Sequence, residues 1–174
     1  GAVNTLAFAG GAVKGYNTDV HGFVELAKEA GAPIDQPGGA VVLLGAGGAA
    51  RAVAAAVHGR GKLAIVARTP RSFVVDGVAL TVAPWSDDLL GKLLSRADVL
   101  VDATPRGLDQ SAAPIDLSPL PAHAVVLDLV VARETALTRA ARARGLKAAA
   151  GTAMLVHQGA RALELWTGKP APIE

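Results

Sequence analysis

A glycine-rich loop at residues 45–50 is the part of the sequence whose residue types and spacing most directly predict chemistry. The loop reads GAGGAA, fits the pattern Gly-x-Gly-x-x-Gly/Ala, and lies between an apolar run at 40–44 and an alanine-rich stretch at 48–58. Glycines in this pattern allow a tight strand-to-helix turn and let the backbone approach a pyrophosphate, which binds to N–H groups at the positive end of the helix. The loop therefore predicts a dinucleotide site, with a ligand-free tight turn as the alternative. The residues predicted to cradle the dinucleotide are Gly45, Ala46, Gly47, Gly48 and Ala49.

The segment after the next apolar run predicts which dinucleotide binds. Sites that prefer NAD carry Asp or Glu about 20 residues beyond the glycine loop, whereas this chain has Arg68 and Arg71 there. A carboxylate would repel a 2′-phosphate, and a guanidinium can form paired hydrogen bonds to it. The sequence therefore predicts NADP(H) rather than NAD(H), and two solvated loop arginines are the alternative.

Strands and helices that alternate along the chain would position this loop. Glycine-bounded apolar runs predict buried parallel strands, and apolar residues three and four apart predict helices. The predicted strands are 40–44, 63–67, 98–101, 124–127 and 146–149, and the predicted helices are 18–30, 48–58, 86–94, 134–144 and 153–166. Two hairpins are also predicted, one joining 3–8 to 12–16 and one joining 73–75 to 78–82 through Asp76-Gly77. This order predicts an α/β fold with a doubly wound, mostly parallel Rossmann-type sheet.

The composition argues against several other classes of protein. Of the 174 residues, 51% are hydrophobic and 18% are charged, so the chain can bury a core rather than stay disordered. A net charge of +2 without a basic run predicts no nucleic-acid partner, and glycines and Arg51 interrupt the most apolar stretch, 40–57, so we expect no membrane span. There is no cysteine, and the four histidines lack ligand spacing, so we expect no metal site. No signal peptide opens the chain, and we expect a cytoplasmic protein.

A series of short motifs resembles the shikimate dehydrogenase family from residue 1 to about residue 168. The motifs are GAVNT at 1–5, NTD at 17–19, GAGGAA at 45–50, ART at 67–69, DATP at 102–105, and Gly151 followed by MLVHQ at 154–158. That family catalyses the reversible, NADP-linked reduction of 3-dehydroshikimate to shikimate in aromatic amino-acid biosynthesis. The resemblance implies an NADP-dependent oxidoreductase with a small-molecule substrate, and it leaves a homodimer open.

The resemblance also implies how the chain is divided. Residues 1–38 resemble the end of the family's substrate domain with its connecting helix, and 39–150 resemble the NADP-binding Rossmann domain. Residues 151–174 resemble the C-terminal helix that returns to the substrate cleft. Because residue 1 is not Met and the family's catalytic lysine lies upstream of the GAxNT motif, we expect a piece of something longer. We expect this chain alone to bind NADP(H) without turnover.

Individual residues take roles by resemblance. Asn4, Asp19 and Gln158 would hold the substrate, and Asp19 would also pair with the family's lysine in proton transfer. Gly151 would leave room for the nicotinamide. The further residues implied on the cofactor side are Thr69, Thr104 and Leu129. From the residues alone, Asp19 could instead cap a helix and Gln158 could be a polar surface residue.

Several positions depart from the family's pattern. Val131 stands where the family has a tyrosine that touches substrate, and Asp102 replaces a common asparagine, with a loop cap as the alternative for this carboxylate. The hairpin at Asp76-Gly77 replaces a crossover helix, so part of the adenine-side wall is expected to differ. Neither Lys14 nor Lys28 lies in the catalytic-lysine motif.

These departures keep two other functions open. Val131 is compatible with a dehydrogenase acting on quinate or another polyol acid. Val131 and the shortened crossover together are compatible with a non-catalytic dinucleotide-binding or scaffold module.

Overall fold

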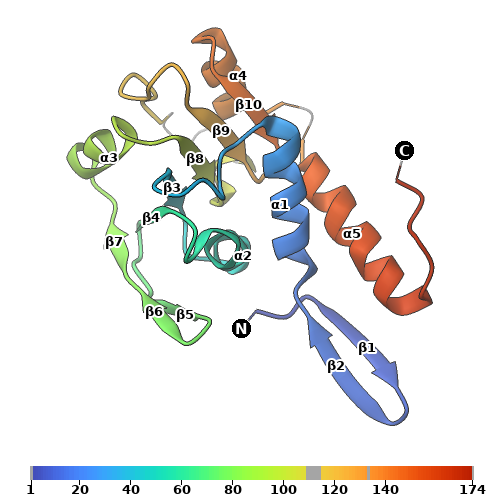
Figure 1. Ribbon diagram of the computed structural model, residues 1–174. Coiled ribbons are helices and arrows are strands. Elements are labelled where there is room, and N and C mark those ends of the chain that lie inside the picture. The colour runs from blue at the N-terminus through green and yellow to red at the C-terminus, as the bar shows by residue number, and fades with distance from the viewer. Residues whose placement is uncertain (1, 109–114, 133, 174) are drawn as a thin grey trace.

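Six parallel strands form the central sheet of the protein, for which a computed structural model describes residues 2–108, 115–132 and 134–173 (Figure 1). The strands are β3 (Ala40–Leu44), β4 (Lys62–Ala67), β7 (Val82–Pro84), β8 (Val99–Asp102), β9 (Val125–Asp128) and β10 (Lys147–Ala150). Their order is β10-β9-β8-β3-β4-β7. The chain runs outward from β3 to β7, returns to β8 beside β3, and runs outward again to β10. Sheets of this kind bind ligands beyond the carboxyl ends of the strands where the order reverses, which here is between β3 and β8.

Helices cover both faces of this sheet. They are α1 (Thr18–Ala30), α2 (Gly48–Val57), α3 (Asp87–Leu94), α4 (Ala136–Ala143) and α5 (Thr152–Thr167), with a 3₁₀ turn η1 (Pro105–Leu108) after β8. Alternate residues of one strand point to opposite faces, so Leu43 packs with α1 and α2, whereas Leu44 packs with α3 and α4. These two buried clusters confirm the predicted doubly wound α/β fold.

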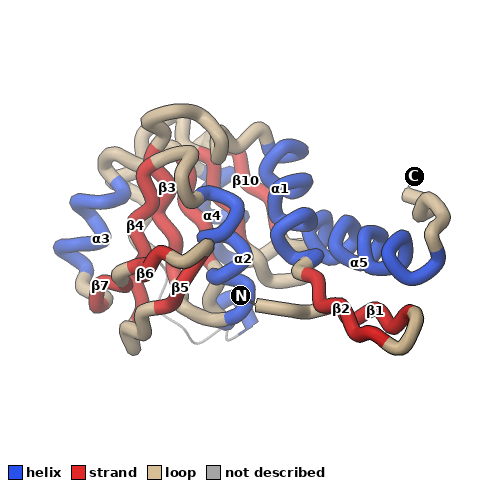
Figure 2. Tube along the Cα trace, turned by 60° about the horizontal axis from the view of Figure 1, so that its bottom comes forward, coloured by secondary structure: helices blue, strands red, loops and turns tan. Residues whose placement is uncertain are grey.

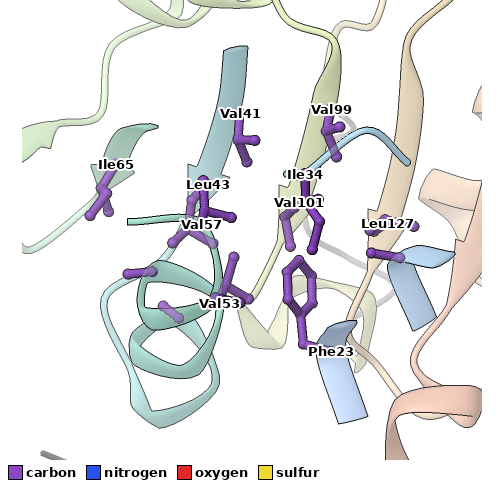
Figure 3. Close-up of a cluster of buried hydrophobic side chains, with 14 of the residues drawn as sticks. Phe23, Ile34, Val41, Leu43, Val53, Val57, Ile65, Val99, Val101 and Leu127 are labelled. Carbon is purple, nitrogen blue, oxygen red and sulfur yellow. The ribbon is translucent and has the colours of Figure 1, made fainter. Parts of the chain in front are cut away.

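The larger cluster joins α1 and α2 to the sheet (Figure 3). Phe23 of α1 is fully buried and lies beside Ile34, Val101 and Leu127. With few aromatic side chains in the chain, most of this core consists of Val, Leu and Ala. Phe23 is therefore the largest side chain that α1 contributes to this cluster.

Two antiparallel hairpins lie outside the central sheet, as the sequence predicts. They are formed by β1 (Thr5–Ala9) with β2 (Ala12–Tyr16), and by β5 (Phe73–Val75) with β6 (Val78–Leu80). Figures 1 and 2 show β1 and β2 projecting beyond the N-terminal end of α1, near the C-terminal end of α5. The indole Nε1 of Trp166 in α5 donates to the carbonyl oxygen of Leu6 in β1 at 2.9 Å, which ties the hairpin to that helix.

Two predicted details were wrong. The N-cap of α1 is Asn17 rather than Asp19, because the Asn17 side chain accepts a hydrogen bond from the Asp19 backbone N–H. The predicted strand 78–82 is split into β6 and β7, and β7 pairs with β4 instead of continuing the hairpin. In the described ranges, no helix combines the length and the apolarity needed to cross a membrane.

Candidate functional site

The glycine loop joins β3 to α2 at the point where the strand order reverses. Gly45 has a φ of 105°, and a Cβ atom there would lie 3.0 Å from the Ala103 carbonyl oxygen, so this turn requires glycine. By contrast, a Cβ on Gly47 or Gly48 would have no heavy atom within 4 Å. Gly47 is the N-cap residue of α2, but it has no side chain to accept a hydrogen bond from the helix N–H groups. The first turn of α2 contains no acidic residue. The loop thus presents open space and helix N–H groups where a phosphate group could bind.

A hollow of about 220 Å³ opens beside this loop. The residues that line it are Gly45, Ala46, Gly47, Ala67, Arg68, Thr69, Trp85, Ala103, Thr104, Pro105 and Arg106. The structure therefore gathers six of the predicted cofactor residues, from the ends of β3, β4 and β8. The predicted residues outside this lining are Gly48, Ala49, Arg71, Leu129 and Gly151.

Trp85 and Arg106 lie in the hollow without having been predicted from the sequence. Trp85 follows β7, and Arg106 lies in η1 after β8. The central guanidinium carbon of Arg106 is 5.0 Å from the centre of the Trp85 ring, which is a cation–π distance. The signal that could have located Trp85 was a separate strand ending at residue 84, which would place the next residue at the same sheet edge as Gly45.

Asn4, Asp19 and Gln158 come together although they are far apart in the sequence. The Asn4 side-chain Nδ2 donates to Asp19 Oδ1 at 2.7 Å, to Thr18 Oγ1 at 2.9 Å and to Gln158 Oε1 at 3.5 Å. Asn4 Oδ1 in turn accepts from the Thr18 backbone N–H at 2.9 Å. This polar cluster lies between the start of the β1–β2 hairpin, the first turn of α1 and the middle of α5. Thr18 is a member that sequence reasoning missed.

Gly22 makes this cluster possible by letting α5 approach α1. A Cβ on Gly22 would lie 2.5 Å from the Met154 carbonyl oxygen and 2.9 Å from the Gln158 Cβ. Any larger residue would separate the two helices, because these atoms belong to the backbone and the stem of α5. Gly22 therefore fixes the distance of Gln158 from Asp19.

Gly151 stands immediately before α5, where the chain turns back towards the sheet. Its backbone N–H donates to the Val130 carbonyl oxygen at 2.9 Å, and a Cβ would overlap the Leu129 carbonyl group. The close approach of these two backbones explains why glycine is needed here. Val131, which follows Val130 in the sequence, is exposed, with 55% of its surface accessible.

Asp102 and Asp128 form a pair of buried carboxylates at the ends of β8 and β9. They face each other in the parallel register and are 2% and 1% exposed. Asp102 Oδ1 accepts from the Thr104 backbone N–H at 2.8 Å, as the loop-cap interpretation predicted. Burial raises the pKa of Asp102, and the neighbouring Asp128 carboxylate acts in the same direction. Within the described part of the chain, Asp128 Oδ2 has no hydrogen-bond partner.

Comparison with known proteins shows which family the chain resembles. The model of the Shikimate 5′-dehydrogenase C-terminal domain matches residues 151–174. A shikimate dehydrogenase (NADP(+)) of Nitrobacter winogradskyi is 44% identical over 178 residues, covering 98% of this chain and 63% of that protein. The chain is similar to shikimate dehydrogenases over nearly its whole length. It spans less than two thirds of the length of the curated relatives it matches, between 61% and 66%.

Solved structures of this family share the fold. A shikimate 5-dehydrogenase of Thermus thermophilus in complex with NADP(H) and shikimate has a TM-score of 0.77 and 38% identity, covering 97% of this chain and 63% of that one. A quinate dehydrogenase of Corynebacterium glutamicum in complex with NAD has a TM-score of 0.76 and 31% identity, covering 96% of this chain and 63% of that one. The Rossmann-type sheet of this chain is therefore that of an oxidoreductase family.

Proposed function

We propose that the chain binds NADP(H) in the hollow beside the glycine loop. The observation that carries this proposal is the combination of open space over Gly47 and Gly48 with the N-terminus of α2, which no side chain caps. Backbone N–H groups there would bind the pyrophosphate. Arg68 and Thr69, at the same end of the sheet, would bind the adenosine 2′-phosphate. A role for Arg71, which is exposed outside the lining, stays a prediction.

We propose that the cluster of Asn4, Asp19 and Gln158 binds the substrate hydroxyl groups. Its amide and carboxylate groups can donate to and accept from vicinal hydroxyls, and a polyol could replace the hydrogen bonds that these side chains now make to one another. When bound, NADP(H) supplies the hydride. Reduction of a ketone leaves an alkoxide that needs a proton, and Asp19 would hold and orient the group that delivers it.

For the whole protein, we propose the reduction of 3-dehydroshikimate to shikimate in aromatic amino-acid biosynthesis. The support is the likeness to shikimate dehydrogenases together with the presence of Asn4, Asp19 and Gln158 in one cluster. Proton transfer in this family also uses a lysine, and neither Lys14 nor Lys28 lies in its motif. The 174-residue chain alone should therefore bind the cofactor and not turn over.

Calorimetric titration with NADPH and NADH tests the first part of this proposal. We expect tighter binding of NADPH, because only NADPH carries the 2′-phosphate that Arg68 can contact. No binding of either cofactor would instead favour a module without a dehydrogenase function. NADP-dependent oxidation of shikimate by the chain alone would overturn its predicted inactivity.

Quinate or another polyol acid is the second candidate substrate. Two observations favour this candidate. Val131 is exposed where the family has a tyrosine that touches substrate, and the chain is similar to a quinate dehydrogenase. The ratio of kcat/KM for shikimate and quinate, measured on a complete protein containing this chain, decides between them. A higher value for quinate would replace shikimate as the proposed substrate.

A further inference from the structure

Trp85 and Arg106 approach each other from opposite sides of the glycine loop. Trp85 follows β7 at one edge of the sheet, whereas Arg106 lies after β8 near its centre. Two strands, β4 and β3, separate β7 from β8. The contact between the two side chains therefore crosses the carboxyl ends of the strands that carry Arg68 and Gly45.

Both partners are anchored through their backbones. The Trp85 N–H donates to the Ala67 carbonyl oxygen at 3.0 Å, extending the pairing of β7 with β4, and the indole Nε1 donates to Asp87 Oδ1 at 3.3 Å. The Arg106 N–H donates to Thr104 Oγ1 at 3.3 Å. The Trp85 ring can then hold the Arg106 guanidinium in place, 5.0 Å from its centre.

Arg106 lies in the hollow, whereas Arg71, the second arginine that the sequence predicted to bind the 2′-phosphate, does not. Arg106 lines the hollow together with Arg68 and Thr69, whereas Arg71 is exposed and lies outside the lining. A guanidinium packed on an aromatic ring can still donate hydrogen bonds in its own plane to phosphate oxygens. Arg106 thus has the chemistry and the location of a phosphate-binding residue.

We propose that Arg106, positioned by Trp85, binds the adenosine 2′-phosphate and contributes to the preference for NADP(H) over NAD(H). This inference rests on the proposed function of the hollow as a dinucleotide site. It assigns Arg106 as a specificity-determining residue and Trp85 as a positioning residue. The ligand class is a 2′-phosphorylated adenosine, and the two side chains line the hollow together with Arg68.

The test is the ratio of the NADH and NADPH dissociation constants for single variants of the 174-residue chain. Arg106→Ala should lower the preference for NADPH by about 10- to 100-fold, mainly by weakening NADPH binding, because charge-assisted hydrogen bonds to the phosphate are lost. Arg106→Gln keeps most of the side-chain volume and should give a similar loss. Arg96→Ala is the charge-matched control, because Arg96 is exposed before β8, at the opposite end of the strand, and should change the ratio less than twofold.

Variants of Trp85 show whether its ring positions Arg106 or only packs against neighbouring side chains. Trp85→Ala should lower the same ratio by several-fold, and Trp85→Phe should restore most of it because a ring face remains. Adenosine 2′,5′-bisphosphate should also change the emission of Trp85 when Trp166→Phe removes the other tryptophan.

The outcomes distinguish this inference from the proposed function. If the unmodified chain prefers NADPH and both Arg106 variants keep that preference within twofold, the role of Arg106 is overturned and the cofactor site stands. If the unmodified chain binds neither cofactor nor the bisphosphate, both proposals are overturned. Unchanged Trp85 emission on saturation with the bisphosphate would contradict the place of Trp85 beside the bound phosphate.

Discussion

Gly45 and Gly47 lie in the same loop, but only Gly45 is required by the protein atoms around it. Gly45 has a positive φ and lies against Ala103, so Gly45→Ala should destabilise the fold by about 1–3 kcal/mol. Gly47 has a φ of −82° and open space around it, so Gly47→Ala should change stability by less than about 0.5 kcal/mol. The new Cβ at residue 47 should nevertheless weaken NADPH binding by at least about 10-fold, because it occupies the space the pyrophosphate needs.

Urea unfolding and NADPH titration of both variants provide the comparison. Equal losses of stability in the two variants would contradict the different surroundings of these glycines. An unchanged NADPH affinity in Gly47→Ala would contradict the position proposed for the pyrophosphate.

Asp102 should make stability depend on pH in the direction opposite to that of an ordinary paired carboxylate. Burial raises its pKa in the folded protein, so folding favours the protonated acid and stability falls as pH rises from about 4 through the raised pKa. Asp102→Asn removes the buried charge and can keep the hydrogen bond from Thr104. The melting temperature of this variant should exceed that of the unmodified chain at pH 7–8, by about 2–4 °C for each kcal/mol relieved, and the difference should vanish near pH 4.

Asp116 provides a control of opposite sign. Hydrogen bonds from the Ser118 backbone N–H and hydroxyl lower its pKa, so its contribution is present at neutral pH and is lost as pH falls through that lowered value. Asp116→Asn should therefore lower the melting temperature slightly at pH 7 and not at low pH. A gain for Asp102→Asn that is the same at every pH would rule out the buried charge as its cause.

Position along the chain made some site residues predictable. Arg68 follows a recognisable strand at a fixed distance from the glycine loop, so its place in the hollow could be expected, and the family resemblance implied Thr69 beside it. The meeting of Trp85 with Arg106 could not, because it depends on which strands lie between β7 and β8 and on how far each side chain reaches.

The packing of α1 on α5 controls the geometry of the polar cluster. Gly22→Ala would place a methyl group 2.5 Å from the Met154 carbonyl oxygen, and we expect a loss of about 1–3 kcal/mol as the helices separate. Gly159→Ala is the matched control, because Gly159 is also helical and a Cβ there meets no atom within 4 Å. It should stabilise the protein by up to about 1 kcal/mol through helix propensity.

Thermal unfolding of the two variants, with chemical shifts of the Gln158 side-chain amide, measures this effect. If Gly22→Ala were as stable as Gly159→Ala and left the Gln158 signals unchanged, the close helix contact would not control the cluster.

Element boundaries were predictable where the hydrophobic period was long. Helix α1 and strand β3 agree with the predicted ranges 18–30 and 40–44 because apolar residues recur over the whole length of each. The short strand β7 was missed because Val82 follows the apolar residues 78–80 after a single threonine, and only the pairing of β7 with β4 separates it from β6. The N-cap was misplaced because Asn17, Thr18 and Asp19 are all good capping residues, and backbone conformation selects among them.

At the scale of the whole molecule, the stability of the protein depends on single side chains in the core much more than on those of the β1–β2 hairpin. Phe23 is fully buried between α1 and the sheet, so Phe23→Ala should cost about 3–5 kcal/mol through lost burial and the cavity left behind. Phe8→Ala removes the same side chain from the β1–β2 hairpin, where it is 75% exposed, and should change stability by less than about 0.5 kcal/mol. Urea denaturation measures both values, and similar losses in the two variants would contradict the burial difference.

The two edges of the central sheet have a consequence for how copies of this protein behave at high concentration. An unpaired strand edge can recruit a strand from another molecule and start aggregation, and short edge strands, proline and lysine oppose this. The edge strand β7 has only three residues and ends at Pro84, which has no backbone N–H to donate. The opposite edge strand, β10, has four residues and begins with the exposed Lys147, whose charge would repel the same residue of an adjoining copy. The strand ends that form the cofactor hollow therefore belong to a sheet that resists edge-to-edge growth into fibrils.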